Sequence, residues 1–457
     1  MKDVLKEIVK SVPDYKVFKT VDELDESSKE LAKRYSNEVS LLEVGRSRDN
    51  NPIYCLKIGN GEKSALLYAF PHPNEPIGSL VLDYLSEKLA SSKELRDVFD
   101  FTWYIIKVAD PDGAKLNEGW FKGPFNPLNY ALNFYRPAGN QQVEWTFPIK
   151  YKTLDFNSPI PETKALMNIM EEAKPDFIYS LHNAGFGGVY FYITDEAPLL
   201  YPIFEKAYKD LNLPASLGEP EMPYAVKLAD AVYKMPTTED TYDYYEKYSD
   251  KDPAEIIKSG TASYGYARRF NDKIFELVCE VPYYYDPRIE DLSSVDKIRR
   301  DLVLKNIDTM QHNYEDLENI YNTVKNKLIV KTPMQQAIDY FLDSAKKSIP
   351  AEKKWAQQAK ELGRKATVAE EFDNELVSKF YRMLIWGMFR RMLLINYEAS
   401  KDMDLKSAAD DVYQKLQSLN EKLEKGLNYT VIPIQKLVKV QLMAGLYSAL
   451  HVKEGCK

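Results

Sequence analysis

Strand-like and helical segments alternate along the chain from about residue 15 to residue 290. The apolar runs SALLYAF, FTWYIIKVA and DFIYSLH are typical of buried strands, and PIGSLVLDYLSEKL has apolar residues at the three- and four-residue spacing of a helix. This alternation predicts an α/β fold in which helices flank a mixed, largely parallel sheet. Sites in such sheets gather at the carboxyl ends of the strands, so the residues that follow each predicted strand are the first candidates for chemistry.

The last third of the chain has a different pattern. After about residue 325, long segments with helical periodicity follow one another and glycines are few. We therefore divide the chain into an α/β domain over residues 1–325 and an all-α domain over residues 326–457. Charged residues such as Arg390 and Lys439 interrupt the apolar stripes of the second domain, which favours a bundle core over a membrane surface. If the stripe along residues 380–394 were exposed, it would favour a homo-oligomer formed through this domain.

Charge and cysteine content narrow the classes of protein. The 457 residues carry a net charge of -8 with no basic block, which argues against nucleic acid or an anionic membrane as the main partner. The first residues lack the apolar core of a secretory signal, and no uncharged stretch is long enough to span a bilayer. Cys55 and Cys279 lie in strand-like runs and Cys456 in the tail, so we expect reduced thiols rather than a disulfide framework. Together these features predict a cytoplasmic protein.

Two predicted strands end in side chains that can bind a metal. His72 and Glu75 follow SALLYAF in the segment FPHPNEP, and His182 ends DFIYSLH. The histidine–glutamate pair alone is weak evidence, since a surface loop could contain it by chance. However, a catalytic zinc site needs three protein ligands and one open position, and the two strand ends together supply them. We predict one Zn²⁺ per chain and assign no site role to His312 and His451, which lie in helical segments.

These residues and several further motifs resemble the zinc carboxypeptidases of the carboxypeptidase A/B and D/E types over roughly residues 15–290. LLEVGRSRDNNPIYCLKIG is similar to the opening strand pair of that family, HPNE to its first two zinc ligands and SLHNAG to its third. DPDG resembles the turn after the next strand, and SPIPETKAL the start of a helix. The resemblance implies a zinc-dependent hydrolase that cleaves an amide bond at or near the C-terminus of a peptide.

Such a reaction needs a general base, and the strand KIFELVCEVP offers two glutamates on one face. Glu280 lies at the carboxyl end of the strand, where the site should be, and resembles the catalytic glutamate of the family. Glu276 is the alternative and would otherwise be a paired structural glutamate. SGTASYGYARRF is similar to the family segment whose mobile tyrosine closes over substrate, which implies a catalytic role for Tyr264, with Tyr266 as the alternative.

The segment GPFNPLNYALNFYRPAG departs from the family pattern. Asn133 fits the asparagine that helps to grip the substrate carboxylate, but Phe134 stands where the gripping arginine is expected and Pro124 where the arginine that polarises the carbonyl is expected. Ala131 replaces an aspartate that would orient the first zinc histidine. Arg136 lies two residues beyond the expected arginine. It could bind the substrate carboxylate in place of that arginine, or it could form a structural ion pair.

Several functions therefore remain open. Without a carboxylate-binding arginine, the chain could be an amidase or deacylase acting on a modified peptide, a peptidoglycan fragment or an acylated amino acid. Glu144, in the following segment QQVEWTFP, could meet a positive group of the substrate or be structurally paired. A zinc-containing binding or scaffold protein that no longer hydrolyses is the alternative from another class.

Overall fold

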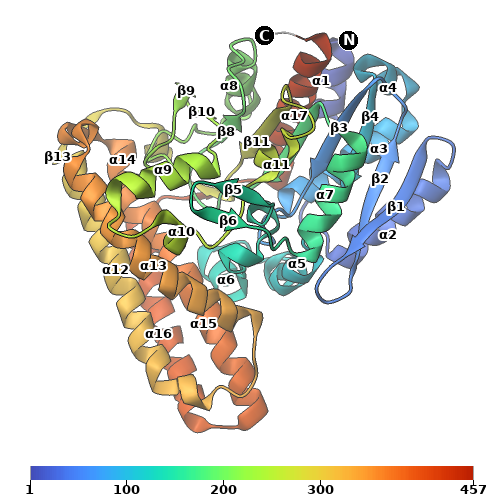
Figure 1. Cartoon of the computed structure of the whole chain (residues 1–457). Coiled ribbons are helices and arrows are strands. Elements are labelled where there is room, and N and C mark those ends of the chain that lie inside the picture. The colour runs from blue at the N-terminus through green and yellow to red at the C-terminus, as the bar shows by residue number, and fades with distance from the viewer. Residues whose placement is uncertain (1, 456–457) are drawn as a thin grey trace.

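A nine-stranded mixed sheet forms the centre of the computed structural model, which describes residues 2–455 (Figure 1). In spatial order its strands are β1 (Val39–Arg46), β2 (Pro52–Ile58), β4 (Phe101–Ile106), β3 (Lys63–Tyr68), β7 (Phe177–His182), β11 (Phe275–Glu280), β8 (Tyr190–Ile193), β10 (Val232–Lys234) and β9 (Lys227–Ala229). The central strands β4, β3, β7 and β11 are parallel to one another, whereas β1 pairs antiparallel with β2, β2 with β4, and β8 with β11. The mixed sheet predicted from the alternation is confirmed.

Helices cover both faces of this sheet. Alternate residues of β3 point to opposite sides, with Ala65 and Leu67 in the apolar core that includes α3 (Ile77–Ser91) and α17 (Ile434–Glu454). Leu66 and Tyr68 face the core formed with α7 (Pro161–Ala173). The remaining helices of this region are α1 (Lys2–Lys10), α2 (Val21–Arg34), α4 (Lys93–Phe99), α5 (Pro111–Asn117), α6 (Pro127–Asn133), α8 (Tyr201–Lys209), α9 (Thr238–Tyr248), α10 (Pro253–Ile256) and α11 (Ser263–Ala267).

The predicted turn DPDG is in fact the beginning of a helix. Asp110 caps α5 by accepting a hydrogen bond from the Gly113 backbone N–H, and Pro111 occupies the first helical turn. Proline costs little there, since the first backbone N–H groups of a helix have no partner within it. Small two-stranded ladders join β5 (Ile149–Tyr151) to β6 (Leu154–Phe156), β12 (Tyr284–Tyr285) to β15 (Thr430–Val431), and β13 (Ser294–Ile298) to β14 (Lys365–Thr367).

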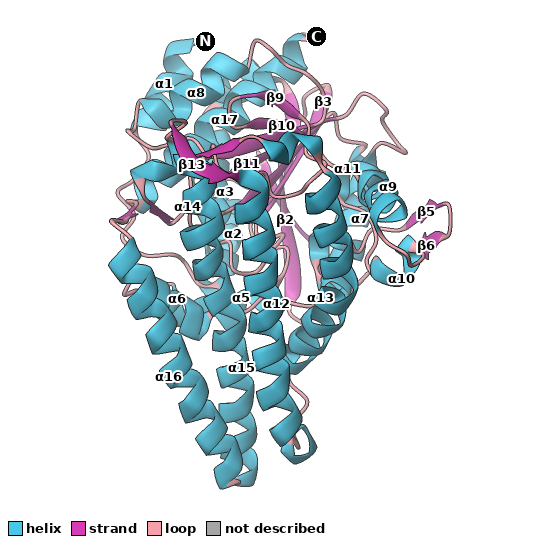
Figure 2. Cartoon of the chain, turned by 90° about the vertical axis from the view of Figure 1, so that its left-hand side faces the viewer, coloured by secondary structure: helices cyan, strands magenta, loops and turns pink. Residues whose placement is uncertain are grey.

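Four long helices extend away from the sheet and run side by side (Figure 2). They are α12 (Arg299–Val324), α13 (Pro333–Gln358), α15 (Ser378–Ser400) and α16 (Met403–Gly426), and the short α14 (Val368–Phe372) precedes α15. α12 precedes the predicted boundary at residues 325 and 326 but packs against α13, α15 and α16, while α17 follows that boundary and packs against α3, α8 and β11. The contacts therefore do not follow the division into two domains, which stays a prediction about independent folding.

Helix α15 is docked on the α/β part of the chain rather than exposed. Phe380, Met383, Trp386 and Phe389 are buried, and α15 packs on α6. This burial removes the exposed apolar stripe on which the expectation of a homo-oligomer depended. Cys55 and Cys279 are buried free thiols as expected, and Cys456 lies outside the described residues. Within residues 2–455, every helix is too short or too polar to cross a bilayer.

The α15–α6 contact gives a first testable prediction. A Cβ atom added to Gly387 would lie 1.7 Å from the backbone oxygen of Ala131, far too close for two atoms that are not bonded to each other. We expect Gly387→Ala to push α15 away from α6 and to lower the free energy of unfolding by about 1–3 kcal/mol, the usual cost of overpacking. Denaturant unfolding measures this change. Gly363→Ala is the matched control, because the nearest atom to its added Cβ is 3.8 Å away, and an equal loss in the control would contradict the prediction.

Candidate metal and catalytic site

The three predicted metal ligands come together at the carboxyl edge of the sheet. β3 ends at Tyr68 and leads into a tight turn in which the backbone N–H of Glu75 donates to the His72 carbonyl at 3.1 Å. His182 is the last residue of the neighbouring strand β7. One ligand atom from each of His72, Glu75 and His182 lies within 4.8 Å of the others, and all three residues are buried, so the surface-loop interpretation of His72 and Glu75 is wrong.

The donor set fits a zinc ion. Two imidazoles and one carboxylate make a typical catalytic zinc set, which leaves a position for water or substrate. His72 Nδ1 is buried without a hydrogen-bond partner, an arrangement that is costly unless the nitrogen binds something else. Burial and the positive charge of Arg136 hold the pKa of His72 well below its usual value, which favours the neutral imidazole that a metal requires.

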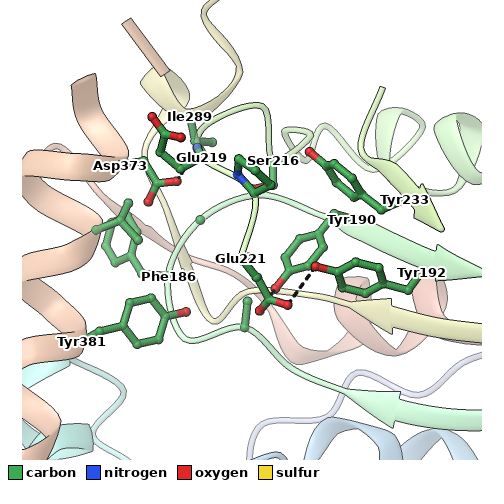
Figure 3. A pocket seen from close by; sticks show the side chains of 14 residues that line it. Phe186, Tyr190, Tyr192, Ser216, Glu219, Glu221, Tyr233, Ile289, Asp373 and Tyr381 are labelled. Carbon is green, nitrogen blue, oxygen red and sulfur yellow. Dashed lines mark hydrogen bonds between the residues drawn. The ribbon is translucent and has the colours of Figure 1, made fainter. Parts of the chain in front are cut away.

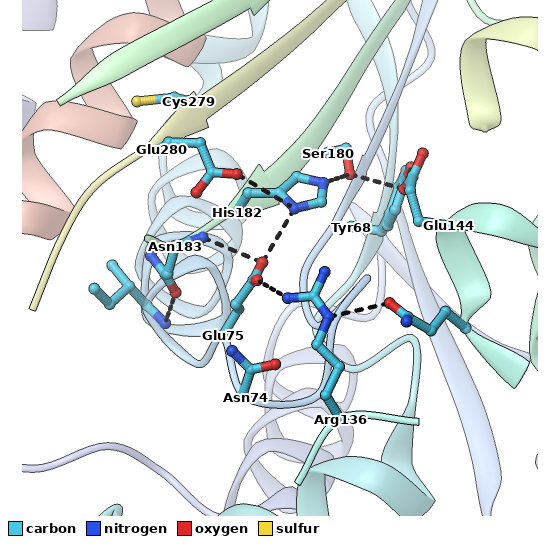
Figure 4. Close-up of polar contacts among 12 residues, drawn as sticks. Tyr68, Asn74, Glu75, Arg136, Glu144, Ser180, His182, Asn183, Cys279 and Glu280 are labelled. Carbon is cyan, nitrogen blue, oxygen red and sulfur yellow. Dashed lines mark hydrogen bonds and ion pairs between the residues drawn. The ribbon is translucent and has the colours of Figure 1, made fainter. Parts of the chain in front are cut away.

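Backbone and side-chain contacts fix the orientation of Glu75 (Figure 4). The Asn183 backbone N–H donates to Glu75 Oε2 at 3.2 Å, and Asn183 Oδ1 accepts from the Ile77 backbone N–H at 3.0 Å. Asn183 thus connects the loop after His182 to the first turn of α3. His182 Nδ1 lies 3.1 Å from Glu75 Oε2, so the two ligands already face one point.

Arg136 points into this site. Its Nη1 donates to Glu75 Oε1 at 3.1 Å, and its Nε donates to Gln142 Oε1 at 3.2 Å. The guanidinium group lies 5.8 Å from the centre of the Trp145 ring, and the Trp145 ring in turn meets His72 edge-on at 5.4 Å. Arg136 therefore brings a positive charge beside the candidate metal position, where it contacts the candidate ligand Glu75 and the Trp145 ring.

Glu280 occupies the position expected of a general base. It pairs in register with His182 across β11 and β7, and its Oε1 lies 3.8 Å from His182 Nδ1. Burial, together with the negative charges of Glu75 and Glu221, raises the pKa of Glu280 well above its usual value, while Arg136 opposes this shift. A carboxyl group in this position can take a proton from a neighbouring water and release it again.

A buried chain of hydrogen bonds supports His182 from behind. His182 Nε2 lies 2.8 Å from Ser180 Oγ, which donates to Glu144 Oε2 at 3.1 Å. Because the Ser180 hydroxyl donates its only proton to Glu144, its oxygen accepts a hydrogen bond from His182 Nε2–H. His182 Nδ1 then carries no proton and is free to bind a metal. Glu144 also accepts from the hydroxyls of Tyr68 at 2.6 Å and Ser263 at 2.7 Å. Glu144 is thus a structural residue, and the suggestion that it meets a substrate cation is wrong.

The other predicted residues lie elsewhere. Glu276 sits four residues before Glu280, about 13 Å along the strand, and its Oε1 lies 2.6 Å from Ser263 Oγ. Tyr264 is half-buried, with the Arg268 guanidinium 5.5 Å from its ring centre and Glu276 among its neighbouring charges. The Tyr266 hydroxyl donates to Glu171 of α7, and the Asn133 side chain donates to Asn129 within α6. The catalytic role of Tyr264 and the substrate role of Asn133 stay predictions.

The family assignment follows from a match over more than half of the chain. The family model described as zinc carboxypeptidase matches residues 24–297. This chain belongs to the zinc carboxypeptidase family. Zinc carboxypeptidase A 1 of Anopheles gambiae is 30% identical over 145 residues, which are 29% of this chain and 32% of that relative. The match thus spans about a third of the length of the curated relative.

Two solved carboxypeptidase structures are similar to this chain at low identity. Carboxypeptidase A from Helicoverpa armigera is 14% identical with a TM-score of 0.39, over 79% of this chain and 81% of that structure. Metallo-carboxypeptidase from Burkholderia cenocepacia is 14% identical with a TM-score of 0.35, over 73% of this chain and 68% of that structure. The family match over residues 24–297 covers the nine strands of the sheet, and the helices α12 to α16 follow it in the chain.

The departures from the family pattern coincide with the docking of α15. Ala131 is fully buried, and Gly387 packs directly on its backbone. Phe134 is buried as well, and the Arg391 guanidinium of α15 donates to the carbonyls of Asn133 and Phe134, each at 2.9 Å. The residues that stand in place of the aspartate and the arginine are therefore buried where α15 docks.

Sequence reasoning missed several residues that hold the site. Ser180 could have been found, because strand alternation puts it on the face of His182. Gln441 of α17 donates to the His182 carbonyl at 2.6 Å and to the Cys279 carbonyl at 3.0 Å, and thereby ties together the ends of β7 and β11. Nothing in the local sequence indicates that role, because Gln441 lies more than a hundred residues from both partners.

The serine behind His182 gives a second prediction. Ser180→Ala removes the partner of His182 Nε2, so the imidazole can rotate and lose the tautomer that binds the metal. We expect zinc affinity to fall by about 10- to 100-fold, as is typical when the outer partner of a histidine ligand is removed. Competition with a chromophoric chelator measures the affinity. Ser448→Ala, at a buried serine whose hydroxyl is unpartnered, should bind zinc as the unmodified chain does. Unchanged affinity in Ser180→Ala would contradict the arrangement.

Proposed function

We propose that this zinc carboxypeptidase family member hydrolyses an amide bond at or near the C-terminus of a peptide. The observation that carries the proposal is the approach of Glu280 to within 3.8 Å of His182 in the same buried cluster as His72 and Glu75. A zinc ion bound there would supply a water of lowered pKa and polarise the substrate carbonyl. Intact ligands together with an intact base also argue against the scaffold alternative.

The residues of the chain would divide the remaining work. Glu280 would take a proton from the attacking water and pass it to the leaving amine, since it lies beside the candidate ligand His182. Ser180 and Asn183 would hold His182 and Glu75 in place, and burial would keep bulk water from competing. Arg136 forms an ion pair with Glu75 and is our candidate for binding the terminal carboxylate, with Trp145 beside it.

An amidase or deacylase is the second candidate function. Phe134 is buried under α15 instead of offering a cation, and this observation favours a substrate without a free terminal carboxylate. The substrate would then be a modified peptide, a cell-wall fragment or an acylated amino acid. A cytoplasmic location stays a prediction for either function.

One experiment separates these functions. Matched peptides with free and amidated C-termini are incubated with the full chain, with and without a zinc chelator. Chelator-sensitive cleavage restricted to free C-termini supports a carboxypeptidase, and cleavage of both kinds supports the second candidate. Absence of cleavage in the zinc-loaded chain would leave the binding or scaffold protein and overturn the proposal.

The role of Arg136 gives a third prediction. Arg136→Lys keeps a positive charge near Glu75 but loses the planar fork that meets a carboxylate with two parallel bonds. We expect kcat/KM on free-carboxylate peptides to fall by about 10- to 100-fold, the effect of a hydrogen bond to a charged group, with little change on amidated peptides. Zinc content is the control and should not change. An equal fall on both kinds of peptide would assign Arg136 to a structural ion pair with Glu75.

A further inference from the structure

A cavity adjoins the candidate site on the side of the helical region. This cavity of about 200 Å³, here called the tyrosine pocket, is lined by Phe186, Tyr190, Tyr192, Glu221, Tyr233 and Tyr381, with Asp373 at its edge (Figure 3). Tyr190 is the strand partner of Glu280 in the β8–β11 register. The charge of Glu221 also contributes to the raised pKa of Glu280, so the pocket and the candidate base are neighbours.

Glu221 brings an uncompensated negative charge to the tyrosine pocket. Its two carboxylate oxygens accept hydrogen bonds from the hydroxyls of Tyr190 at 2.7 Å and Tyr192 at 3.0 Å, which fix its position. Within residues 2–455, no lysine, arginine or histidine forms an ion pair with Glu221. The nearby Glu219, in contrast, is neutralised by a two-point contact with Arg299. An anion would be repelled here, and a neutral group would leave the charge unmatched.

A second acidic group adds to this negative field. The Asp373 carboxylate accepts from the Glu219 backbone N–H at 2.7 Å, and burial with the nearby charges of Glu219 and Glu221 raises its pKa to about 7. A carboxyl group with that pKa is half-ionised near neutral pH, and a cation bound beside it would favour its charged form.

The aromatic walls suit the same kind of ligand. Phenylalanine and tyrosine rings attract cations to their faces, and the tyrosine pocket contains several such rings around one carboxylate. Its volume corresponds to about seven water molecules, enough for a short aliphatic chain with a charged head. A larger hollow of about 550 Å³ shares Glu219, Pro220 and Glu221 with the tyrosine pocket and offers an approach between the sheet and the bundle.

The helical region closes the tyrosine pocket. Tyr381 of α15 accepts a hydrogen bond from the Gly185 backbone N–H at 3.0 Å, three residues after the metal ligand His182. Asp373 comes from the segment between α14 and α15. The added helices thus contribute side chains to the pocket beside the candidate site.

We propose that the tyrosine pocket binds a cationic side chain of the substrate, an alkylammonium or guanidinium group, while the neighbouring amide bond faces Glu280. Glu221 would be the residue that determines this preference. The inference rests on the proposed hydrolysis of an amide bond and names the class of substrate.

Peptides that differ at one residue test the preference. Zinc-loaded chain is given peptides that carry lysine, arginine, norleucine or glutamate on either side of the bond that is cleaved. We expect kcat/KM to be about 10- to 100-fold higher for lysine or arginine than for norleucine, and lowest for glutamate. Glu221→Gln should bring the lysine-to-norleucine ratio close to one, whereas Glu205→Gln, at an exposed glutamate of α8, should keep it. Equal rates for lysine and norleucine would overturn the inference.

A binding measurement separates this inference from the proposed function. n-Butylammonium and n-butylguanidinium contain no amide bond, and n-butanol is a neutral analogue of similar size. We expect ligand-observed NMR on the full chain to give at least about tenfold tighter binding of either cation than of butanol, and Glu221→Gln to remove the difference. This preference can be found even if no peptide is cleaved. If the cations and butanol bound equally and peptides were still cleaved, the cation preference of the tyrosine pocket would be contradicted and the proposed hydrolysis would not.

Discussion

Replacement of Glu280 by glutamine is expected to stop hydrolysis while zinc stays bound. The amide cannot take up the proton of the attacking water, and general-base catalysis typically contributes about 10²- to 10⁴-fold. The side chain keeps its size, so the buried cluster around His182 should not collapse. Steady-state kinetics on a cleaved peptide measures the loss, and elemental analysis measures the bound metal.

Glu276→Gln is the matched control on the same strand. Glu276 is fully buried, and burial together with Glu144 raises its pKa well above the usual value, so glutamine mimics the protonated form that this environment favours. We expect this variant to keep activity within a few-fold of the unmodified chain. If Glu276→Gln lost activity and Glu280→Gln kept it, the assignment of the base would be reversed.

Replacement of His72 by alanine is expected to abolish zinc binding and, with it, activity. The change leaves two protein ligands where a catalytic zinc site needs three, and Arg136 then faces Glu75 without a competing metal. Bound zinc should fall from about one per chain to near zero. Added zinc should also raise the free energy of unfolding of the unmodified chain, by about 2.7 kcal/mol at a zinc concentration a hundredfold above the dissociation constant. His72→Ala should show no such rise.

His312→Ala provides the control for the loss of a histidine. His312 is exposed on α12, away from the ligand cluster. This variant should keep zinc, activity and the zinc-dependent rise in melting temperature. Normal zinc content in His72→Ala would show that the metal binds elsewhere and would contradict the ligand assignment.

The clustering of the three candidate ligands was predictable because it depends on local rules. Strand periodicity put His182 at a strand end, and the proline-rich segment after SALLYAF put His72 and Glu75 at another. The parallel pairing of β3 with β7 then brings both ends to one edge. The choice of Glu280 over Glu276 used the same rule, since only Glu280 lies at the carboxyl end.

The rest depends on contacts between distant segments. In the sequence, Ala131 and Phe134 indicate only that an aspartate and an arginine of the family pattern are missing. The docking of α15 on these two residues explains why they differ. Tyr381 and Gln441 reach the loop and strand ends around His182 from helices about two hundred residues or more away. Helical periodicity predicts that such helices exist, but it does not say which face of the sheet they cover or which side chain reaches the site.

A zinc titration of hydrolysis tests the central claim most directly. The full chain is stripped with a chelator, dialysed and given zinc in steps while cleavage of a peptide from the free and amidated panel is followed. We predict that activity is absent in the stripped chain, rises in proportion to added zinc and reaches its plateau at about one zinc per chain. Hydrolysis that survives chelation, or zinc-saturated chain that cleaves no peptide, would contradict the claim.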